Sequence, residues 1–384
     1  DSSSSSDDVI TVGFSQVGAE SDWRTANSQS MKDTFSKENG YDLIFDDAQQ
    51  KQENQITAIR NFIQQEVDYI LLAPVTETGW DTVLQEAKDA DIPVIIVDRM
   101  VDVSDDSLYT TWIGTDALCE GRKAAEWLNG FAEAKGIAAS DIHIADIQGT
   151  IGSTAQIGRT KGLEEGVDKY GWDLVAQQTG EFTQAKGQEV MESMLKQYDN
   201  INVVYCENDN EAFGAIDAIE AAGKTVGSDI ANGEIMVISF DTTHAGLQDV
   251  LDGKIECDVE CNPLHGPRAE ELIKKLNSHR EQFITAMDDD LNTADGVAAV
   301  FELVKDINTS ILDKEVSKNV CQTAAAVFDE LCDVLGILYN RKNNDVDSDI
   351  EALIEERQQA RANKDWATAD RIRDELKAKG IILK

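Results

Sequence analysis

Short apolar runs alternate with longer amphipathic stretches along residues 9–276 of this chain. The apolar runs are typical of buried strands, and the stretches between them carry apolar residues at helical spacing, as Ile56, Ile59 and Ile63 do. We expect strands at residues 9–14, 41–46, 69–73 and 93–97, and helices at 23–38, 52–65 and 83–90. Strands separated by helices predict βαβ units around a parallel sheet.

The same alternation restarts after a break at residues 109–115. Expected strands lie at residues 141–147, 173–178, 203–206, 235–240 and 255–259, and expected helices at 121–131, 156–170, 187–196, 211–222 and 247–252. The front of the chain is therefore predicted to be α/β, with two lobes that each contain a doubly wound parallel sheet.

From residue 281 onward the strand pattern disappears and helical periodicity takes over. Helices are expected from residue 292 or 293 to 308, and over 316–338, 348–363 and 366–379, which predicts an all-α bundle as the tail. The predicted domains are a flexible tether (1–8), a first lobe (9–111 plus 262–278), a second lobe (112–261) and the helical tail (279–384). We expect the join between two unrelated sequences to lie near Asn277-Ser278-His279.

The charge of the chain argues against nucleic acid as a partner. The chain carries 73 acidic and 34 basic residues, a net charge of −39, of which only −8 falls after residue 278. Binding to nucleic acid depends largely on Lys and Arg side chains that neutralise phosphates, so no nucleic acid is expected to bind. No apolar run is long enough to span a membrane. The six cysteines are too scattered for a disulfide scaffold, and the pair Cys257 and Cys261 is interpreted as buried apolar residues rather than a metal site.

Polar side chains follow the expected strands in both lobes. They include Ser15-Gln16, Asp98-Arg99, Gln148-Gly149-Thr150, Glu207-Asn208-Asp209 and Asp241, with the aromatic residues Phe14 and Trp23 nearby. In open α/β sheets the ligand lies beyond the carboxyl ends of the strands. Planar polar groups can bind neighbouring hydroxyls in pairs, and an aromatic ring can stack on the apolar face of a sugar. A single such residue is more often a turn or cap residue, but the joint pattern in both lobes favours a sugar site.

Several segments resemble one known family. Residues 12–17 (Val-Gly-Phe-Ser-Gln-Val), 21–24 (Ser-Asp-Trp-Arg), 49–55 (Gln-Gln-Lys-Gln-Glu-Asn-Gln), 92–99 (Ile-Pro-Val-Ile-Ile-Val-Asp-Arg) and 261–263 (Cys-Asn-Pro) resemble the type I solute-binding proteins of sugar ABC importers, and within them the galactofuranose-binding branch. This resemblance covers residues 9–276. It implies a two-lobed fold with a hinge, and a ligand site formed by Phe14, Gln16, Trp23, Arg24, Asp98, Arg99, Gln148, Arg159, Asn208, Asp241 and Asn262.

The resemblance also implies a mechanism and partners. A monosaccharide, galactofuranose or another aldose, would favour a closed form by contacting both lobes, which move about hinge segments at 109–114 and 259–263. The chain would be a monomer that delivers its sugar to the membrane permease of an ABC importer, without a cofactor and without catalysis. The Ser/Asp run at residues 1–8 would suit a processed exported protein or lipoprotein outside the cytoplasm, and no signal peptide is seen in this chain. Family members usually continue with a segment that crosses back between the lobes, and here the tail replaces it.

The tail resembles a second, unrelated family. Residues 287–295, 331–338, 354–361 and 365–380 are similar to the C-terminal helical region of cysteinyl-tRNA synthetase. The catalytic motifs and zinc ligands of that enzyme have no counterpart in this chain, so the resemblance implies an appendage that does not aminoacylate tRNA. A few tRNA contacts from Arg357, Arg361, Arg371 or Arg373 are conceivable, although a solvated helix face is the simpler interpretation.

Three alternatives to a sugar receptor stay open. A tRNA-binding module with the sugar-binding part as its appendage would bind RNA in a salt-dependent way. A sugar-responsive transcription regulator would need a basic helix-turn-helix before the first strand, where this chain has Ser and Asp. An enzyme would need a catalytic constellation, and the four histidines (His143, His244, His265 and His279) suggest none, although a pair of carboxylates could still act.

Overall fold

The computed structural model describes residues 9–288, 293–311, 318–337, Thr368 and 371–372 of this chain. The chain forms two compact units, Asp1–Phe328 and Asp329–Lys384. The predicted tether (1–8), the predicted tail helix at 348–363 and most of that at 366–379 lie outside the described residues.

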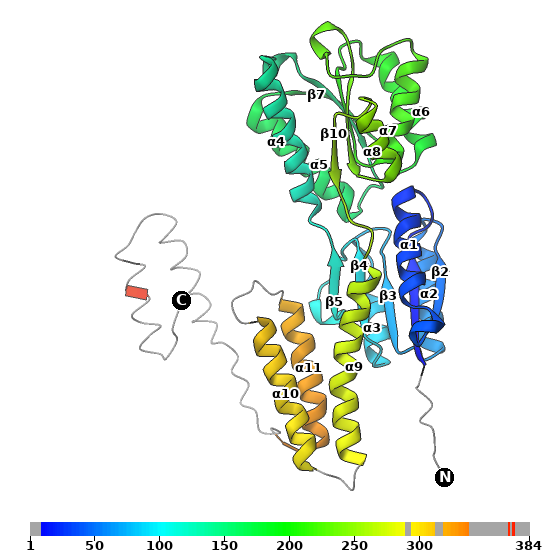
Figure 1. The fold of residues 1–384 in the computed structure, drawn as a ribbon, viewed down its shortest axis with the longest axis vertical. Coiled ribbons are helices and arrows are strands. Elements are labelled where there is room, and N and C mark those ends of the chain that lie inside the picture. Colours follow the sequence, from blue (N-terminus) through cyan, green and yellow to red (C-terminus); the bar gives the residue numbers. More distant parts are fainter. Residues whose placement is uncertain (1–8, 289–292, 312–317, 338–367, 369–370, 373–384) are drawn as a thin grey trace. The chain divides into compact units, whose positions relative to one another are not determined.

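The first sheet contains five parallel strands in the order β2-β1-β3-β4-β5 (Figure 1). Its two faces are both covered by helices, and its central strands β3 and β4 are accordingly almost continuous apolar runs. Ile70 and Leu72 of β3 face the core formed with α2 and α3, whereas Leu71 faces the core formed with α1 and α9. We call these elements the first lobe: β1 (Ile10–Gln16), β2 (Tyr41–Asp47), β3 (Tyr69–Leu72), β4 (Val94–Asp98), β5 (Thr111–Gly114), α1 (Asp22–Thr34), α2 (Gln52–Gln64), α3 (Asp81–Asp89) and α9 (Gly266–Asp288).

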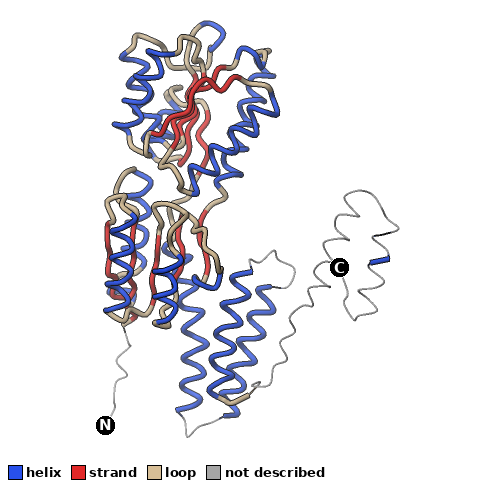
Figure 2. The backbone as a smooth tube through the Cα atoms, turned by 180° about the vertical axis from the view of Figure 1, so that it is seen from behind, coloured by secondary structure: helices blue, strands red, loops and turns tan. Residues whose placement is uncertain are grey.

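The second sheet repeats this arrangement with the order β10-β9-β8-β6-β7, again with all strands parallel (Figures 1 and 2). Helices α4 and α5 cover one face, and α6, α7 and α8 cover the other. The elements of this second lobe are β6 (His143–Gln148), β7 (Asp173–Thr179), β8 (Val203–Cys206), β9 (Met236–Asp241), β10 (Cys257–Glu260), α4 (Ala117–Lys135), α5 (Thr154–Tyr170), α6 (Gln184–Gln197), α7 (Asp209–Ala221) and α8 (His244–Leu251). The predicted pair of doubly wound α/β lobes is therefore present.

The two sheets have equivalent topologies when their strands are matched in chain order. Strands β1 to β5 of the first sheet correspond to β6 to β10 of the second. This correspondence pairs Asp98, the last residue of β4, with Asp241, the last residue of β9. It also pairs the helices that follow the first strand of each lobe, α1 and α5.

Within residues 9–288 the chain passes between the lobes twice, after β5 and after β10. The segment at 109–114, predicted as a break and a hinge, instead contains strand β5, which pairs with β4 from Thr111 to Gly114. Its sequence, Thr-Trp-Ile-Gly, begins with β-branched and aromatic residues that favour strands. The first crossover therefore begins only at Thr115.

Helix α9 runs without interruption through the predicted junction at 277–279. Ala269 and Ile273 bury its first half in the first lobe, and the hydroxyl of Tyr69 donates to Asn277 Oδ1 at 2.5 Å. Beyond the junction Phe283 is also buried, and α9 packs against α10 (Thr293–Ile311). The two sequences are thus joined inside one helix rather than through a linker.

The helical character predicted for the tail is confirmed where the tail is described, in α10 and in α11 (Lys318–Val334). Short 3-10 helices in the lobes lie at Lys37–Asn39, Asp106–Leu108, Ala139–Asp141 and Ile230–Asn232. Among the described helices, none has both the length and the apolar character needed to cross a membrane.

Candidate ligand-binding site

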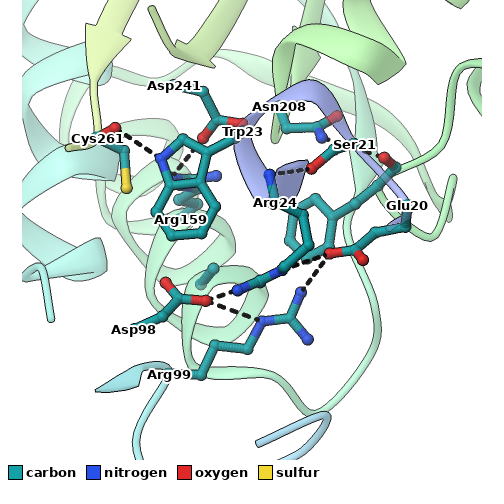
Figure 3. Close-up of a pocket in the computed structure, with 12 residues that line it drawn as sticks. Glu20, Ser21, Trp23, Arg24, Asp98, Arg99, Arg159, Asn208, Asp241 and Cys261 are labelled. Carbon is teal, nitrogen blue, oxygen red and sulfur yellow. Dashed lines mark hydrogen bonds and ion pairs between the residues drawn. The ribbon is translucent and has the colours of Figure 1, made fainter. Parts of the chain in front are cut away.

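A pocket lies between the two lobes, where the carboxyl ends of their strands meet (Figure 3). Its walls come from strand ends and from the first turns of the helices that follow them. The lining residues are Glu20, Ser21, Trp23, Arg24, Asp98 and Arg99 from the first lobe, Ala155, Arg159, Phe182, Asn208 and Asp241 from the second lobe, and Cys261 from the second crossover.

Two arginines and two carboxylates form the wall of the first lobe. Arg24 lies in the first turn of α1, where Ser21 caps the helix. Its Nε donates to Glu20 Oε1 at 2.9 Å, and its Nη2 lies 2.7 Å from Asp98 Oδ2. Arg99 lies farther from the same two carboxylates, at 3.9 Å from Glu20 and 3.8 Å from Asp98, and donates to the carbonyl of Val75. All four side chains are almost completely buried, so their charges must balance within the group.

The electrostatic effects in this wall favour the charged forms of Asp98 and Arg24, but not that of Arg99. Burial raises the pKa of Asp98, but the positive charges of Arg24 and Arg99 outweigh it and hold that pKa below its ordinary value. For Arg24, burial lowers the pKa, and the charges of Asp98 and Glu20 more than compensate. The pKa of Arg99 is lowered to about 10, mainly by burial and then by the neighbouring charge of Arg24.

The second lobe presents one arginine to the pocket. Arg159 is on α5, and its Nε donates to Glu120 Oε2 of α4 at 3.0 Å. Its Nη2 donates to Asp241 Oδ1 at 3.2 Å, and its Nη1 donates to the carbonyl of Glu207. Burial raises the pKa of Asp241 well above its ordinary value, and the charge of Arg159 offsets only part of this effect. The carboxyl group on this wall is thus more readily protonated than Asp98.

Aromatic rings from both lobes complete the pocket. The indole of Trp23 donates to the carbonyl of Cys261 at 2.7 Å, which ties the first lobe to the crossover. Phe182 extends from the loop between β7 and α6, and its ring lies 5.2 Å from the guanidinium of Arg99 in the opposite lobe. Gly149 makes room for this ring, because a Cβ at that position would lie only 1.9 Å from it.

Asn208 uses both side-chain polar atoms within its own lobe. Its Oδ1 accepts from the amide of Glu211 at 2.8 Å and so caps α7, and its Nδ2 donates to the carbonyl of Phe182 at 3.1 Å. Asn208 therefore holds the Phe182 loop at the edge of the pocket.

Three buried polar atoms around the pocket have no hydrogen-bond partner within the described part of the chain: Glu20 Oε2, Asp98 Oδ2 and Arg99 Nε. Asp98 Oδ2 still forms its ion pair with Arg24, but the geometry is not that of a hydrogen bond. Buried polar groups are rarely left unpaired in native proteins. These atoms can bind a ligand that offers hydroxyl donors and acceptors.

Seven of the eleven residues predicted for the site line this pocket: Trp23, Arg24, Asp98, Arg99, Arg159, Asn208 and Asp241. Phe14 does not, because its side chain is completely buried in the core of the first lobe and packs edge-to-face on Phe45. Asn262 does not, because its side chain is exposed and accepts from the amide of Leu264.

Gln16 and Gln148 also lie outside the pocket, and for the same reason. Each is the last residue of the first strand of its lobe, and each bonds to the helix that follows. The amide of Gln16 donates to Asn27 Oδ1, and its Oε1 accepts from Arg24. Gln148 donates to the hydroxyl of Thr160, the neighbour of Arg159. Both glutamines therefore support the site from behind.

Five lining residues were not predicted: Glu20, Ser21, Ala155, Phe182 and Cys261. The strand-end rule could have identified three of them. Glu20 and Ser21 lie between the first strand and its helix, and Phe182 follows a strand of the second sheet, so both places satisfy the strand-end rule.

Residues 12–264 match a family model described as periplasmic binding protein domain. The chain belongs to this family. It is 42% identical over 270 residues to the galactofuranose-binding protein YtfQ of Escherichia coli, a match that covers 69% of this chain and 81% of that protein. A Mycobacterium smegmatis structure in complex with β-D-fucofuranose is 47% identical, with a TM-score of 0.66 over 70% of this chain and 86% of that one. The binding protein of an arabinose ABC transporter from Shewanella sp. ANA-3, bound to L-arabinofuranose, is 38% identical, with a TM-score of 0.64 over 87% of this chain and 100% of that one.

The tail matches different families. Residues 282–339 match the DALR domain, and residues 343–384 match the cysteinyl-tRNA ligase anticodon binding domain. The cysteine–tRNA ligase of Geobacillus thermodenitrificans is 49% identical over 113 residues, which cover 29% of this chain but only 24% of the ligase. Both predicted resemblances are confirmed, and the chain spans about a quarter of the ligases that its tail matches.

Proposed function

We propose that this chain binds a monosaccharide, in a furanose form, between its two lobes. The observation that carries this proposal is the pairing of charged groups across the pocket. Arg24 with Asp98 faces Arg159 with Asp241, and among them lie buried polar atoms that have no hydrogen-bond partner within the described part of the chain. Charged planar groups of this kind form strong, directional hydrogen bonds to neighbouring hydroxyls. The relatives named above, which bind galactofuranose, fucofuranose and arabinofuranose, support the furanose form.

The lobes would close around the sugar because both contribute contacts to it. A ligand shifts a conformational equilibrium only through its different affinity for the two states, and a sugar that contacts both lobes favours the closed one. No covalent step is needed. The bound sugar would be delivered to the permease of an ABC importer outside the cytoplasm, and the family of the chain and its arabinose-transporter relative support this role.

A thermal-shift screen with furanose-forming and other sugars tests the proposal. The panel contains D-galactose, D-fucose, L-arabinose, D-ribose, D-glucose and myo-inositol. A ligand at 100 times its Kd adds about 2.7 kcal/mol to the stability of the folded state. In domains of this size this corresponds to a rise in Tm of roughly 5–10 °C. We expect such a rise with at least one furanose-forming sugar and a Kd in the micromolar range by calorimetry.

Two matched variants assign the binding to the pocket. Arg159→Met removes the guanidinium that faces the pocket and keeps an apolar stem, whereas Arg122→Met removes an exposed guanidinium that pairs with Glu165 between the same two helices. Only the first should abolish the response to sugar. If both variants keep the response, the sugar binds elsewhere. If no sugar raises the Tm of the unaltered chain, the ligand class is wrong.

We infer that the tail adds neither aminoacylation nor tRNA binding to this function. The tail has a net charge of −8 and corresponds to about a quarter of the ligase. Filter binding with cysteine tRNA at low and moderate salt tests this inference, since RNA binding through phosphates would weaken steeply with salt. Salt-dependent binding by the whole chain would favour the alternative of a tRNA-binding module.

A further inference from the structure

The backbone at Asp98 adopts an uncommon conformation. Asp98 ends β4 with a φ of 64°, in the left-handed region that few residues other than glycine occupy. Such conformations persist only where the surrounding structure holds them in place, and they gather at functional sites. Here the turn directs the carboxylate of Asp98 toward Arg24, with 2.7 Å between Oδ2 and Nη2.

Trp112 holds this turn from the neighbouring strand. Its indole Nε1 donates to the carbonyl oxygen of Asp98 at 3.0 Å. Trp112 lies on β5, two residues before Gly114, which is the register partner of Asp98. A Cβ on Gly114 would lie 2.2 Å from the Asp98 oxygen and 2.5 Å from the indole nitrogen. Only glycine at this position leaves the indole free to reach the carbonyl.

Each residue that follows in the turn has a role at the interface between the lobes. Arg99 lines the pocket, and the amide of Met100 donates to the hydroxyl of Thr154 in the second lobe at 2.7 Å. Trp112 and Met100 both pack against the core formed with α2 and α3. A change in the peptide at Asp98 would therefore be transmitted to Asp98, Arg99 and Met100 together.

We propose that Trp112 is a positioning residue for the ligand site, and that it acts through its hydrogen bond to the Asp98 carbonyl. Trp112 is not among the residues that line the pocket and would not contact the ligand. The bond keeps the peptide in the left-handed conformation and so keeps the Asp98 carboxylate between Arg24 and Arg99. The effect of Trp112 on sugar affinity rests on the proposed function, whereas its effect on the position of the Asp98 carboxylate does not.

The test is a double-mutant cycle on sugar affinity. Trp112→Phe keeps an aromatic ring and removes the donor, and Asp98→Asn removes the charge that the donor positions. Trp112→Phe should raise the Kd for the best sugar of the thermal screen about tenfold in the unaltered chain, but less than twofold in the Asp98→Asn background. Trp127→Phe, at a half-buried indole on α4 that stacks on Phe131, is the matched control and should leave the Kd unchanged. Equal effects of Trp112→Phe in both backgrounds, or no effect in either, would overturn the proposal.

A measurement without ligand keeps the result separate from the proposed function. The Nε–H resonances of Arg24 and Arg99 in the sugar-free protein report the position of the Asp98 carboxylate. They should shift in Trp112→Phe and stay in place in Trp127→Phe. If they do so while no sugar binds, the proposed function fails and the positioning role stands. If neither resonance moves, the positioning role fails whether or not a sugar binds.

Discussion

Asp98 and Asp241 occupy equivalent places in the two lobes. Each ends the fourth strand of its sheet, each has a positive φ, and each pairs with an arginine from the helix that follows the first strand of its lobe. The electrostatic surroundings differ. Two arginines lower the pKa of Asp98, whereas burial raises the pKa of Asp241 despite Arg159. The same backbone plan thus supports a charged carboxylate in one lobe and a readily protonated carboxyl in the other.

The difference extends behind the pocket wall. The second lobe buries further carboxyl groups, including Asp146, Glu207 and Glu211, whose pKa values are all raised chiefly by burial. The turns after the two aspartates are also held differently. Trp112 binds the carbonyl of Asp98, and Asp258, at the equivalent position on β10, accepts from the amide of Thr242. The first lobe balances its buried charges with arginines, and the second lobe depends on one arginine and on protonation.

The largest effect that would distinguish the lobes is the removal of an arginine. Arg159→Met leaves Glu120 and Asp241 without their guanidinium, and breaking a buried ion pair in this way costs about 3–5 kcal/mol. Arg24→Met should cost less, because Arg99 remains within 4 Å of both Glu20 and Asp98. Urea unfolding of the two variants measures the difference. Equal losses of stability would show that Arg99 does not compensate and that the lobes are alike.

The next effect is the dependence of stability on pH, and it should have opposite signs in the two lobes. Asp146 is completely buried, and its pKa is raised to about 8, mainly by burial. In the unfolded chain this group loses its proton near pH 4, so its contribution to stability is full below that pH and is lost as pH rises toward 8. Asp146→Asn should therefore match the unaltered chain near pH 4 and exceed its stability by several kcal/mol at pH 8, since each unit of difference between the folded and unfolded pKa corresponds to about 1.4 kcal/mol.

Asp98→Asn provides the opposite test. Because the pKa of Asp98 is lowered in the folded state, its contribution is present above its unfolded pKa and is lost as pH falls through the folded value. The variant should be less stable than the unaltered chain at neutral pH, and the gap should close in acid. Unfolding free energies from urea titrations between pH 3 and pH 8 give both curves. Parallel curves for the two variants would contradict the electrostatic contrast between the lobes.

The two lobes also show how far a sequence predicts such a fold. Continuous apolar runs such as Tyr69–Leu72 identify strands buried on both faces, and the alternation with helices follows from them. Strand β5 was missed because its apolar residues, Trp112 and Ile113, form neither a long apolar run nor an alternating pattern. The continuation of α9 through the junction was missed because the sequence resembles one family before the junction and another family after it. The helical periodicity continues across this boundary.

The site was predicted where strand ends carry unusual side chains, as Asp98-Arg99 does. Gln16 and Gln148 also lie at strand ends, and both predictions were wrong for the same reason. A strand-end position does not reveal whether its side chain points into the cleft or under the next helix, and both glutamines point under the helix. Phe182 was missed because its position depends on Asn208, Glu211 and Gly149, which are brought to it only by the fold.

The smallest effect concerns the position that follows the first strand of each lobe. In the first lobe it is Val17, a buried core residue, and in the second it is Gly149, under the ring of Phe182. Gly149→Ala would force the ring away from Arg99, and overpacking of this kind costs about 1–2 kcal/mol. We expect that loss in thermal unfolding, together with a several-fold weaker affinity for the sugar.

Gly130→Ala is the matched control for this substitution. Gly130 lies within α4 with no atom near the place of a new Cβ, so alanine there should stabilise the chain by about 0.5–1 kcal/mol through helix propensity. Its sugar affinity should not change. If Gly149→Ala behaved like Gly130→Ala, the ring of Phe182 would have free space to move into, and the second lobe would not depend on glycine to shape its wall of the pocket.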